Sequence, residues 1–254
     1  MKRLSAFPIL FMFLALAGLA SCSSSESSGD GGGALYGSNP AAGIPDEEEE
    51  EPEVQEPERL VEISTSFGTM KVKLYNSTPR HRDNFLKLAE EGFYDGTLFH
   101  RVIAGFMIQG GDPDSKTAEP GQRLGQGGPG YTVPAEIRRG NIHKKGALSA
   151  ARLSDGVNPR RESSGSQFYI VQGNKYTSEN FSAFEMNRTY SAAEKQAYFD
   201  VGGYPGLDGQ YTVFGEVIEG LEIIDQIAAV RKDPNDRPLE DVSMTVRILD
   251  EVVE

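Results

Sequence analysis

The chain has 254 residues, with 25 Lys and Arg against 38 Asp and Glu, and its formal net charge is −13. This length suits one large domain or two small ones, and the acidic balance argues against nucleic acid as a partner. Because the sequence holds a single cysteine, no disulfide can form within the chain.

The N-terminus has the features of a secretory signal. Residues 1–3 are a short basic start, residues 7–20 are an apolar run too short to span a bilayer easily, and small residues precede Cys22. A cysteine at this place resembles the lipobox of bacterial lipoproteins. The resemblance implies a signal peptide over residues 1–21 and a lipidated Cys22 that anchors the protein in the bacterial cell envelope, facing the periplasm from the outer or inner membrane. The alternatives are an uncleaved anchor and an ordinary signal with a chance cysteine.

Residues 22–58 are predicted to form a disordered tether. Ser and Gly dominate up to Gly37, and residues 46–51 are six consecutive carboxylates. Such a segment has too little apolar surface to offset the entropy cost of ordering. It carries eleven acidic and no basic residues, whereas residues 59–254 hold 23 basic and 27 acidic residues, a net charge of −4. The strong acidity therefore belongs to the tether and says little about the folded domain.

From residue 59 onward the sequence predicts a folded domain that begins with a hairpin and a helix. Residues 60–64 and 70–74 alternate apolar and polar side chains around a Ser-Phe-Gly-Thr turn. Thr78 followed by Pro79 is a helix start, with the threonine hydroxyl as the expected N-cap. The apolar stripe of this helix comprises Phe85, Leu88 and Ala89.

The central stretch, residues 99–112, predicts a strand, a tight turn and a second strand. Its sequence is Phe-His-Arg-Val-Ile-Ala-Gly-Phe-Met-Ile-Gln-Gly-Gly-Asp. The turn falls at residues 104–105, and the glycine pair 110–111 ends the second strand. An arginine at position 101, close to Phe106, Met107 and Gln109, is unusual in a core. It suits a cationic donor held in the wall of an apolar pocket, although a surface ion pair is the simpler alternative.

The remaining pattern is mostly short strands. Strands are predicted over residues 131–137, 146–151, 167–171, 211–217 and 242–248, and a helix over residues 220–229. Residues 112–130 and 155–164 are predicted to be loops. Residues 177–205 stand out as an insert with one or two helices and Ser178 as a possible cap. Many antiparallel strands with two helices indicate a mostly β domain, a barrel whose ends the helices close.

Four segments in order resemble the cyclophilins, the cyclosporin-binding class of peptidyl-prolyl cis–trans isomerases. They are residues 99–112, 146–151, 165–170 and 207–215, and the resemblance extends over residues 60–252. It implies a closed eight-stranded antiparallel barrel capped by two α-helices, here with the helical insert added. It also implies isomerisation of Xaa-Pro bonds with no cofactor. His81, His100 and His143 lie far apart in the sequence without ligand-like spacing, so no metal site is expected.

The resemblance also assigns the site residues. It implies that Arg101 is catalytic and that the proline pocket is lined by Phe106, Met107, Tyr169 and Leu207. Gln109 and Gln167 are implied as polar groups beside the pocket, and Ala151 and Arg152 as contacts for the residue before the proline. Tyr211 completes the rim. The aromatic and apolar members could also be ordinary core residues, and Tyr169 could turn its hydroxyl into the core.

Several positions depart from the family pattern. Tyr169 is found where the family has a phenylalanine, and Tyr211 where it has a histidine. Arg152 is found where the family has an asparagine whose backbone makes the usual contact. Gly206 is found where the family has a tryptophan linked to cyclosporin affinity, so weak sensitivity to cyclosporin is expected. The loop 153–164 and the insert 177–205 are longer than usual. The insert is either a solvated decoration or a border of the pocket that alters substrate access.

The predicted function is isomerisation of Xaa-Pro bonds during folding of exported proteins, by non-covalent stabilisation of the twisted amide. The expected partners are proline-containing polypeptides and, through the lipidated N-terminus, the membrane; the protein is expected to be a monomer. One alternative is a binding or chaperone module on the same fold, favoured by the altered Tyr169, Gly206 and Arg152. Another is a structural lipoprotein with a vestigial pocket.

Overall fold

The computed structural model describes residues 56–186 and 188–253. The predicted signal peptide, Cys22 and nearly all of the tether lie outside these residues. The first strand begins at Glu58, one residue before the predicted start of the folded domain. Within the described ranges, no helix combines the length and the apolar character needed to cross a bilayer.

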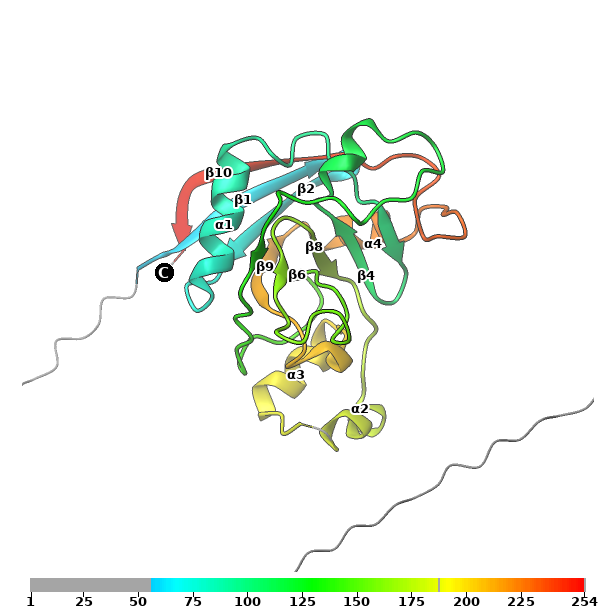
Figure 1. The fold of residues 1–254 in the computed structure, drawn as a ribbon. Helices are drawn as coiled ribbons and strands as arrows, with labels where there is room; N and C mark the ends of the chain where they lie inside the picture. Colours follow the sequence, from blue (N-terminus) through cyan, green and yellow to red (C-terminus); the bar gives the residue numbers. More distant parts are fainter. Residues whose placement is uncertain (1–55, 187, 254) are drawn as a thin grey trace, which may run out of the picture. The chain divides into compact units, whose positions relative to one another are not determined.

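Eight strands form one antiparallel sheet in the order β10-β1-β2-β9-β6-β8-β4-β3 (Figure 1). The predicted mostly β class is therefore confirmed. Backbone hydrogen bonds also join the segments that precede the two end strands, Phe99 N to Val242 O at 2.9 Å among them, whereas closure into a barrel stays a prediction. The strands are β1 Glu58–Thr65, β2 Gly68–Leu74, β3 Arg101–Ile103, β4 Met107–Gly110, β6 Ala147–Ala150, β8 Phe168–Val171, β9 Val213–Glu219 and β10 Met244–Val253.

Residues 112–164 differ from the prediction in two ways: one predicted strand is shorter, and two predicted loops contain regular structure. Of the strand expected over residues 131–137, only β5, Thr132–Val133, is extended, because Pro134 follows and has no N–H for a ladder. β5 pairs with β7, Ser163–Ser164, inside the segment predicted to be a polar loop. The loop after β4 begins with a 3-10 helix, Pro113–Thr117.

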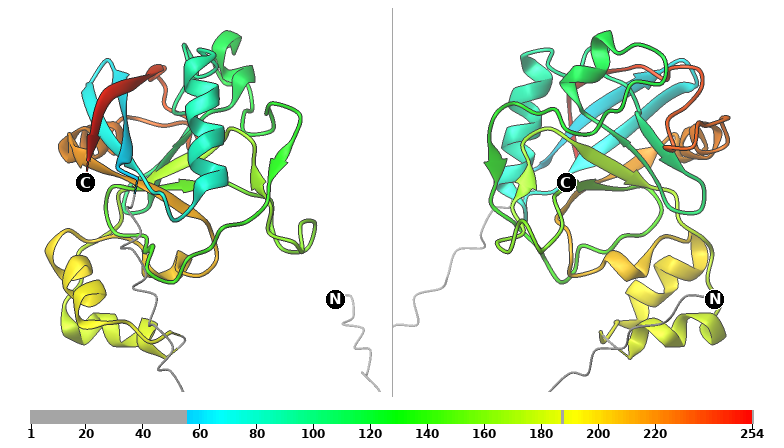
Figure 2. Two further views of the ribbon diagram at one scale, coloured as in Figure 1. Left: turned by 90° about the vertical axis from the view of Figure 1, so that its left-hand side faces the viewer. Right: turned by 45° about the vertical axis from the view of Figure 1, so that its right-hand side comes forward.

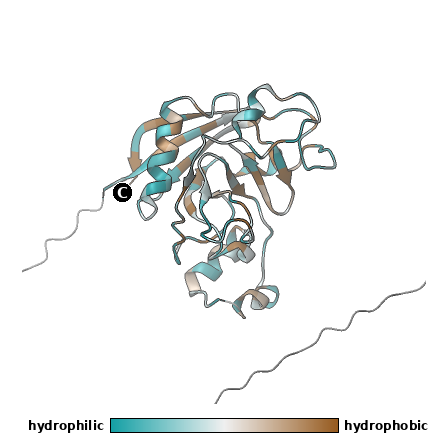
Figure 3. Cartoon of the chain, viewed as in Figure 1, coloured by the Kyte–Doolittle hydropathy of each residue, from teal (hydrophilic) through white to brown (hydrophobic). Residues whose placement is uncertain are grey.

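Two helices pack on different parts of the sheet. Helix α1, Pro79–Glu90, packs against β9 and β10, and α4, Leu221–Ala228, packs against β2, β3 and β4. The two helices are well separated in both views of Figure 2. Figure 3 shows hydrophilic and hydrophobic residues mixed along the helices and strands, as elements with one buried face require. The faces buried in the core comprise Phe85, Leu88 and Ala89 of α1 and Ile223, Ile224 and Ile227 of α4.

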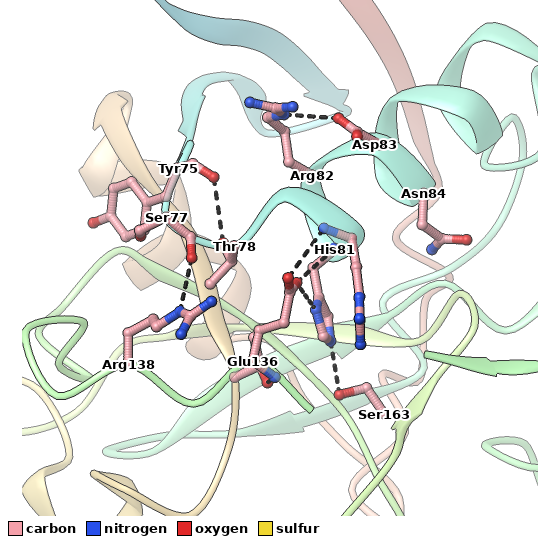
Figure 4. Close-up of polar contacts among 12 residues, drawn as sticks. Tyr75, Ser77, Thr78, His81, Arg82, Asp83, Asn84, Glu136, Arg138 and Ser163 are labelled. Carbon is pink, nitrogen blue, oxygen red and sulfur yellow. Dashed lines mark hydrogen bonds and ion pairs between the residues drawn. The ribbon is translucent and has the colours of Figure 1, made fainter. Parts of the chain in front are cut away.

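The first turn of α1 is capped by a distant carboxylate (Figure 4). Glu136 accepts hydrogen bonds from the backbone N–H groups of Arg80 and His81, at 3.2 and 3.0 Å, and from His81 Nδ1 at 2.7 Å. Thr78 is the N-cap residue, but its hydroxyl donates to the carbonyl oxygen of Tyr75. The predicted hydroxyl cap is wrong because a charged acceptor, favoured at a helix N-terminus, takes its place.

The insert holds two helices, α2 Ser178–Glu185 and α3 Ala192–Asp200, followed by a 3-10 helix, Pro205–Leu207. They lie together in Figure 1. The N-cap of α2 is Thr177 rather than the expected Ser178, which is already the first helical residue. The insert has a small core of its own, separate from the main one, built by Phe181, Tyr190 and Tyr198 with Ile142 from the preceding loop.

Candidate active site

The register of four neighbouring strands determines which side chains face the core of the domain and which lie on the opposite face of the sheet. Paired residues of antiparallel strands share one face of the sheet, and the next pair lies on the other face. Arg101 pairs with Gln109, and Gln109 pairs with Tyr169, so these three side chains lie on the face opposite the core row. The core row, fully buried across β3, β4, β8 and β6, consists of Val102, Ile108, Ile170 and Leu148.

On the face opposite the core row there is a pocket of about 120 Å³. All nine residues that line it belong to the set of ten predicted from the sequence, and the tenth, Gln167, lies directly behind Gln109. The structure therefore brings the predicted residues together, while their individual roles stay predictions. The lining residues are Arg101, Phe106, Met107, Gln109, Ala151, Arg152, Tyr169, Leu207 and Tyr211.

The polar wall of the pocket is a directed series of hydrogen bonds. Arg101 Nη1 donates to Gln109 Oε1 at 3.3 Å, and Gln109 Nε2 donates to Gln167 Oε1 at 3.1 Å. Gln167 Nε2 in turn donates to the carbonyl oxygen of Gly127 at 2.7 Å. The side-chain amides of Gln109 and Gln167 each have one orientation that makes both of these hydrogen bonds. The Arg101 guanidinium is therefore fixed on one side by Gln109. No carboxylate of the described part of the chain lies within 4 Å of Arg101, which leaves the ion-pair alternative without a partner there.

The apolar wall is formed where the turn after β3 meets β8. Gly105, with a φ of 76°, lets the chain turn back so that Phe106 and Met107 follow directly at the pocket. The ring of Tyr169 lines the pocket, but its hydroxyl lies 3.1 Å from His143 Nε2. Burial raises the pKa of Tyr169, so the hydroxyl stays protonated and donates to that nitrogen. A bound proline ring would therefore meet the aromatic ring rather than a free hydroxyl.

At the rim, the side chain of Arg152 is engaged within the protein. Its guanidinium lies 4.4 Å from the ring centroid of Tyr211 and pairs with Asp155, and only 4% of the side chain is exposed. The N–H of Ala151 donates to the carbonyl oxygen of Gln167, and its C=O accepts from the N–H of Ser164. Across residues 56–186 and 188–253, by contrast, the main-chain N–H and C=O of Arg152 have no hydrogen-bond partner. These main-chain groups are available to an extended peptide.

Sequence reasoning missed Tyr204, an aromatic residue that packs against Phe106, one of the lining residues of the pocket. Its ring centroid lies 4.6 Å from that of Phe106, and a Cβ built on Gly206 would approach the Tyr204 ring to 3.3 Å. The aromatic side chain that position 206 lacks is thus supplied two residues earlier, from the end of the insert. The only available signal was an aromatic residue within two positions of the glycine.

Replacing Tyr204 with alanine should lower kcat/KM for a proline-containing peptide by about fivefold, because Phe106 loses the aromatic neighbour that fixes its ring. Tyr204→Phe keeps the ring and is the matched control, expected to stay within about twofold of the unmodified protein. Steady-state isomerisation of one peptide by all three proteins gives the comparison. Equal losses in both variants would contradict a role for the ring.

The lining of the pocket limits its chemistry. It offers two guanidinium groups, of which that of Arg152 is paired with Asp155, one amide and apolar or aromatic walls, and its lining residues include no serine, cysteine, histidine or carboxylate. Such a site can hold a neutral ring and donate hydrogen bonds to a centre that gains electron density, without covalent or proton-transfer steps. Nowhere in the described ranges do three His, Cys, Asp or Glu side chains gather as metal ligands would.

The family model described as cyclophilin type peptidyl-prolyl cis-trans isomerase/CLD matches residues 60–247. The chain belongs to this cyclophilin family. A protein of Staphylococcus aureus strain USA300, described as a candidate peptidyl-prolyl cis-trans isomerase, is 38% identical to this cyclophilin over 194 residues, which are 75% of this chain and 91% of the relative. A candidate bifunctional phosphatase/peptidyl-prolyl cis-trans isomerase of Streptococcus pyogenes serotype M6 is 37% identical over 195 residues, 75% of this chain and 38% of that protein.

Solved structures are also similar to this cyclophilin. A cyclophilin type peptidyl-prolyl cis-trans isomerase of Cryptosporidium parvum matches with a TM-score of 0.57 and 27% identity, over 76% of this chain and 99% of the other. The same protein solved in the presence of the dipeptide Ala-Pro matches with a TM-score of 0.56. Family, relatives and structural neighbours agree on the class of enzyme: this cyclophilin is a peptidyl-prolyl cis-trans isomerase.

Proposed function

We propose that this cyclophilin isomerises Xaa-Pro bonds of exported proteins by stabilising the twisted amide without covalent chemistry. Rotation about an amide has a barrier of about 18–20 kcal/mol, and uncatalysed Xaa-Pro exchange takes roughly tens to hundreds of seconds. Interactions that are stronger in the twisted state than in either planar state accelerate the exchange. Proline isomerisation can limit the rate of folding, so an enzyme that accelerates it would serve newly exported chains.

The observation that carries this mechanism is the fixed guanidinium beside an apolar pocket. As the amide twists, the prolyl nitrogen becomes pyramidal and can accept a hydrogen bond. Arg101 is a cation that has N–H donors left after its bond to Gln109. Phe106 and Met107, with the ring of Tyr169, would hold the pyrrolidine ring while the preceding carbonyl swings. The free main-chain groups of Arg152 would hold the residue before the proline.

The direct test is isomerisation of a proline-containing peptide by the purified protein, followed by refolding of an exported protein whose folding is limited by proline. Acceleration of both reactions supports the proposal. A protein that binds the peptide but accelerates neither reaction would instead be the binding or chaperone module. If the protein neither binds the peptide nor accelerates either reaction, the remaining hypothesis is a structural lipoprotein with a vestigial pocket.

We also propose attachment to the bacterial cell envelope through a lipidated Cys22, supported by the signal-like residues before it. Cys22→Ser should move the protein from the membrane fraction to the soluble fraction of the cell envelope, because one acyl-modified residue is the only anchor proposed. Ser24→Ala is the control and should stay in the membrane fraction. Mass spectrometry of the mature N-terminus checks the lipid; an unmodified Cys22 would contradict the proposal.

Two finer features of the fold belong to the same proposal. A sheet closed into a barrel between β3 and β10 is supported by the isolated bridge that pairs Leu98 with Ser243. A monomer is proposed because one chain supplies all nine residues that line the pocket. Light scattering of the purified protein tests the monomer.

A further inference from the structure

A buried series of hydrogen bonds connects the insert with the floor of the pocket. The Tyr169 hydroxyl lies 3.1 Å from His143 Nε2, and His143 Nδ1 lies 2.9 Å from Asp208 Oδ1. On the other side of the carboxylate, Asp208 Oδ2 lies 2.7 Å from the hydroxyl of Tyr198 and 3.0 Å from that of Tyr190. Both of these tyrosines belong to the insert, so its side chains reach the pocket floor through two intermediates.

The direction of each hydrogen bond follows from the protonation states. Burial lowers the pKa of His143, so the imidazole is neutral at pH 7 and carries one proton. Burial alone would raise the pKa of Asp208, but the hydrogen bonds from His143 and Tyr198 hold it below its usual value. The carboxylate therefore accepts the Nδ1 proton of His143. Nε2 is left as the acceptor for the hydroxyl of Tyr169.

The Asp208 carboxylate depends on the insert for half of its hydrogen bonds. Both the Asp208 and the His143 side chains are fully buried. The carboxylate accepts from Nδ1 and the backbone N–H of His143, and from the hydroxyls of Tyr190 and Tyr198. No Lys or Arg of residues 56–186 or 188–253 forms an ion pair with it. A buried charge balanced only by hydrogen bonds is sensitive to the loss of any donor.

We propose that Tyr190 and Tyr198 are positioning residues for the isomerase pocket, acting through Asp208 and His143 on the ring of Tyr169. The inference rests on the proposed function only in taking this pocket as the place where proline binds. Loss of the two hydroxyls leaves Asp208 with free lone pairs, and the carboxylate and His143 shift to satisfy them. Because the Tyr169 hydroxyl is hydrogen-bonded to His143, the pocket floor shifts with it.

The test removes the hydroxyls and keeps the rings. Tyr190→Phe with Tyr198→Phe should lower kcat/KM for a proline-containing peptide by roughly fivefold, mainly through a higher KM. Tyr176→Phe is the matched control. Tyr176 directly precedes the insert and packs against Phe181 and Phe184 within it, but its hydroxyl bonds to no described residue, so activity should stay within about twofold. Thermal unfolding confirms that the proteins compared are folded, and the single variant Tyr198→Phe replaces the double one if that does not fold.

A double-mutant cycle distinguishes positioning from general destabilisation. In a Tyr169→Phe background the two insert changes should have little further effect on kcat/KM, because the hydroxyl that transmits them is absent. Additive losses would overturn the proposal, as would a folded Tyr190→Phe/Tyr198→Phe protein with unchanged kcat/KM. NMR of the His143 ring nitrogens is independent of activity: their shifts should change in this double variant and not in Tyr176→Phe. Unchanged shifts overturn the proposal even if the protein is not an isomerase.

Discussion

Arg101→Ala is expected to lower kcat/KM for isomerisation of a proline-containing peptide by about a hundredfold or more. The guanidinium is the only charged group of the pocket that is not engaged with a carboxylate within the described residues, because Arg152 is paired with Asp155. A donor that acts on the twisted amide contributes mainly to the transition state. The loss should therefore appear in kcat as well as in kcat/KM. Steady-state isomerisation over a range of peptide concentrations measures both.

Two further variants separate the possible causes of this loss. Arg160→Ala removes the same charge from a side chain that is 82% exposed, and its kcat/KM should stay within about twofold. Arg101→Lys keeps the charge but not the planar fork that bonds Gln109, so a loss of at least tenfold is expected there too. If Arg101→Ala retained most of its activity, stabilisation by the guanidinium would not be the mechanism.

The second large effect is a loss of stability in mild acid. Burial lowers the pKa of His81, His100 and His143, even though a carboxylate opposes this effect at each of them. In the unfolded chain histidine titrates near 6.5. Below that pH the unfolded chain binds protons that the folded chain does not, so the free energy of unfolding falls as the pH falls. Each histidine can contribute a slope of up to about 1.4 kcal/mol per pH unit, which levels off below its folded pKa.

Urea unfolding at several pH values between 8 and 5 measures this effect. The free energy of unfolding should be nearly constant above pH 7 and should fall as the pH drops below 6.5. His100→Gln should remove about a third of the slope, because one of three titrating groups is lost. His100 is chosen because, unlike those of His81 and His143, its ring nitrogens form no hydrogen bond with a carboxylate of the described part of the chain. A free energy that is flat from pH 8 to 5 would be evidence against buried neutral histidines.

The parts of the site that lie on predicted strands could be read from the sequence. The alternation around the turn at Gly105 places Arg101 and Gln109 on one face, since both positions follow from the period of a strand. The pairing of Gln109 with Tyr169 in the next strand needed the family resemblance, because the two residues are sixty positions apart. The nine lining residues and the contact between Gln109 and Arg101 were thus predicted, whereas the hydrogen bonds that continue from Gln109 through Gln167 to Gly127 were not.

Contacts between distant segments could not be predicted in this way. Glu136 caps a helix that begins 57 residues before it, so local capping rules pointed to the hydroxyl of Thr78 instead. Nothing in the spacing of His143 and Asp208 suggests that their side chains meet under the pocket. Tyr204 was missed because the family pattern directed attention to position 206. That the Tyr204 ring lies beside Gly206 and packs against Phe106 follows from the folded structure and not from the spacing in the sequence.

The position of Tyr204 has a consequence for protein engineering and for divergence among relatives. Arg101 and Gln109 lie in one hairpin together with Phe106 and Met107, whereas Tyr204, which packs against Phe106, lies at the end of a segment that has its own small core. Exchanging residues 177–205 as a cassette would replace the aromatic neighbour of Phe106 and leave the hairpin of Arg101 and Gln109 untouched. New substrate preferences could therefore arise by recombination of this segment, without mutations on the strands that carry Arg101 and Gln109.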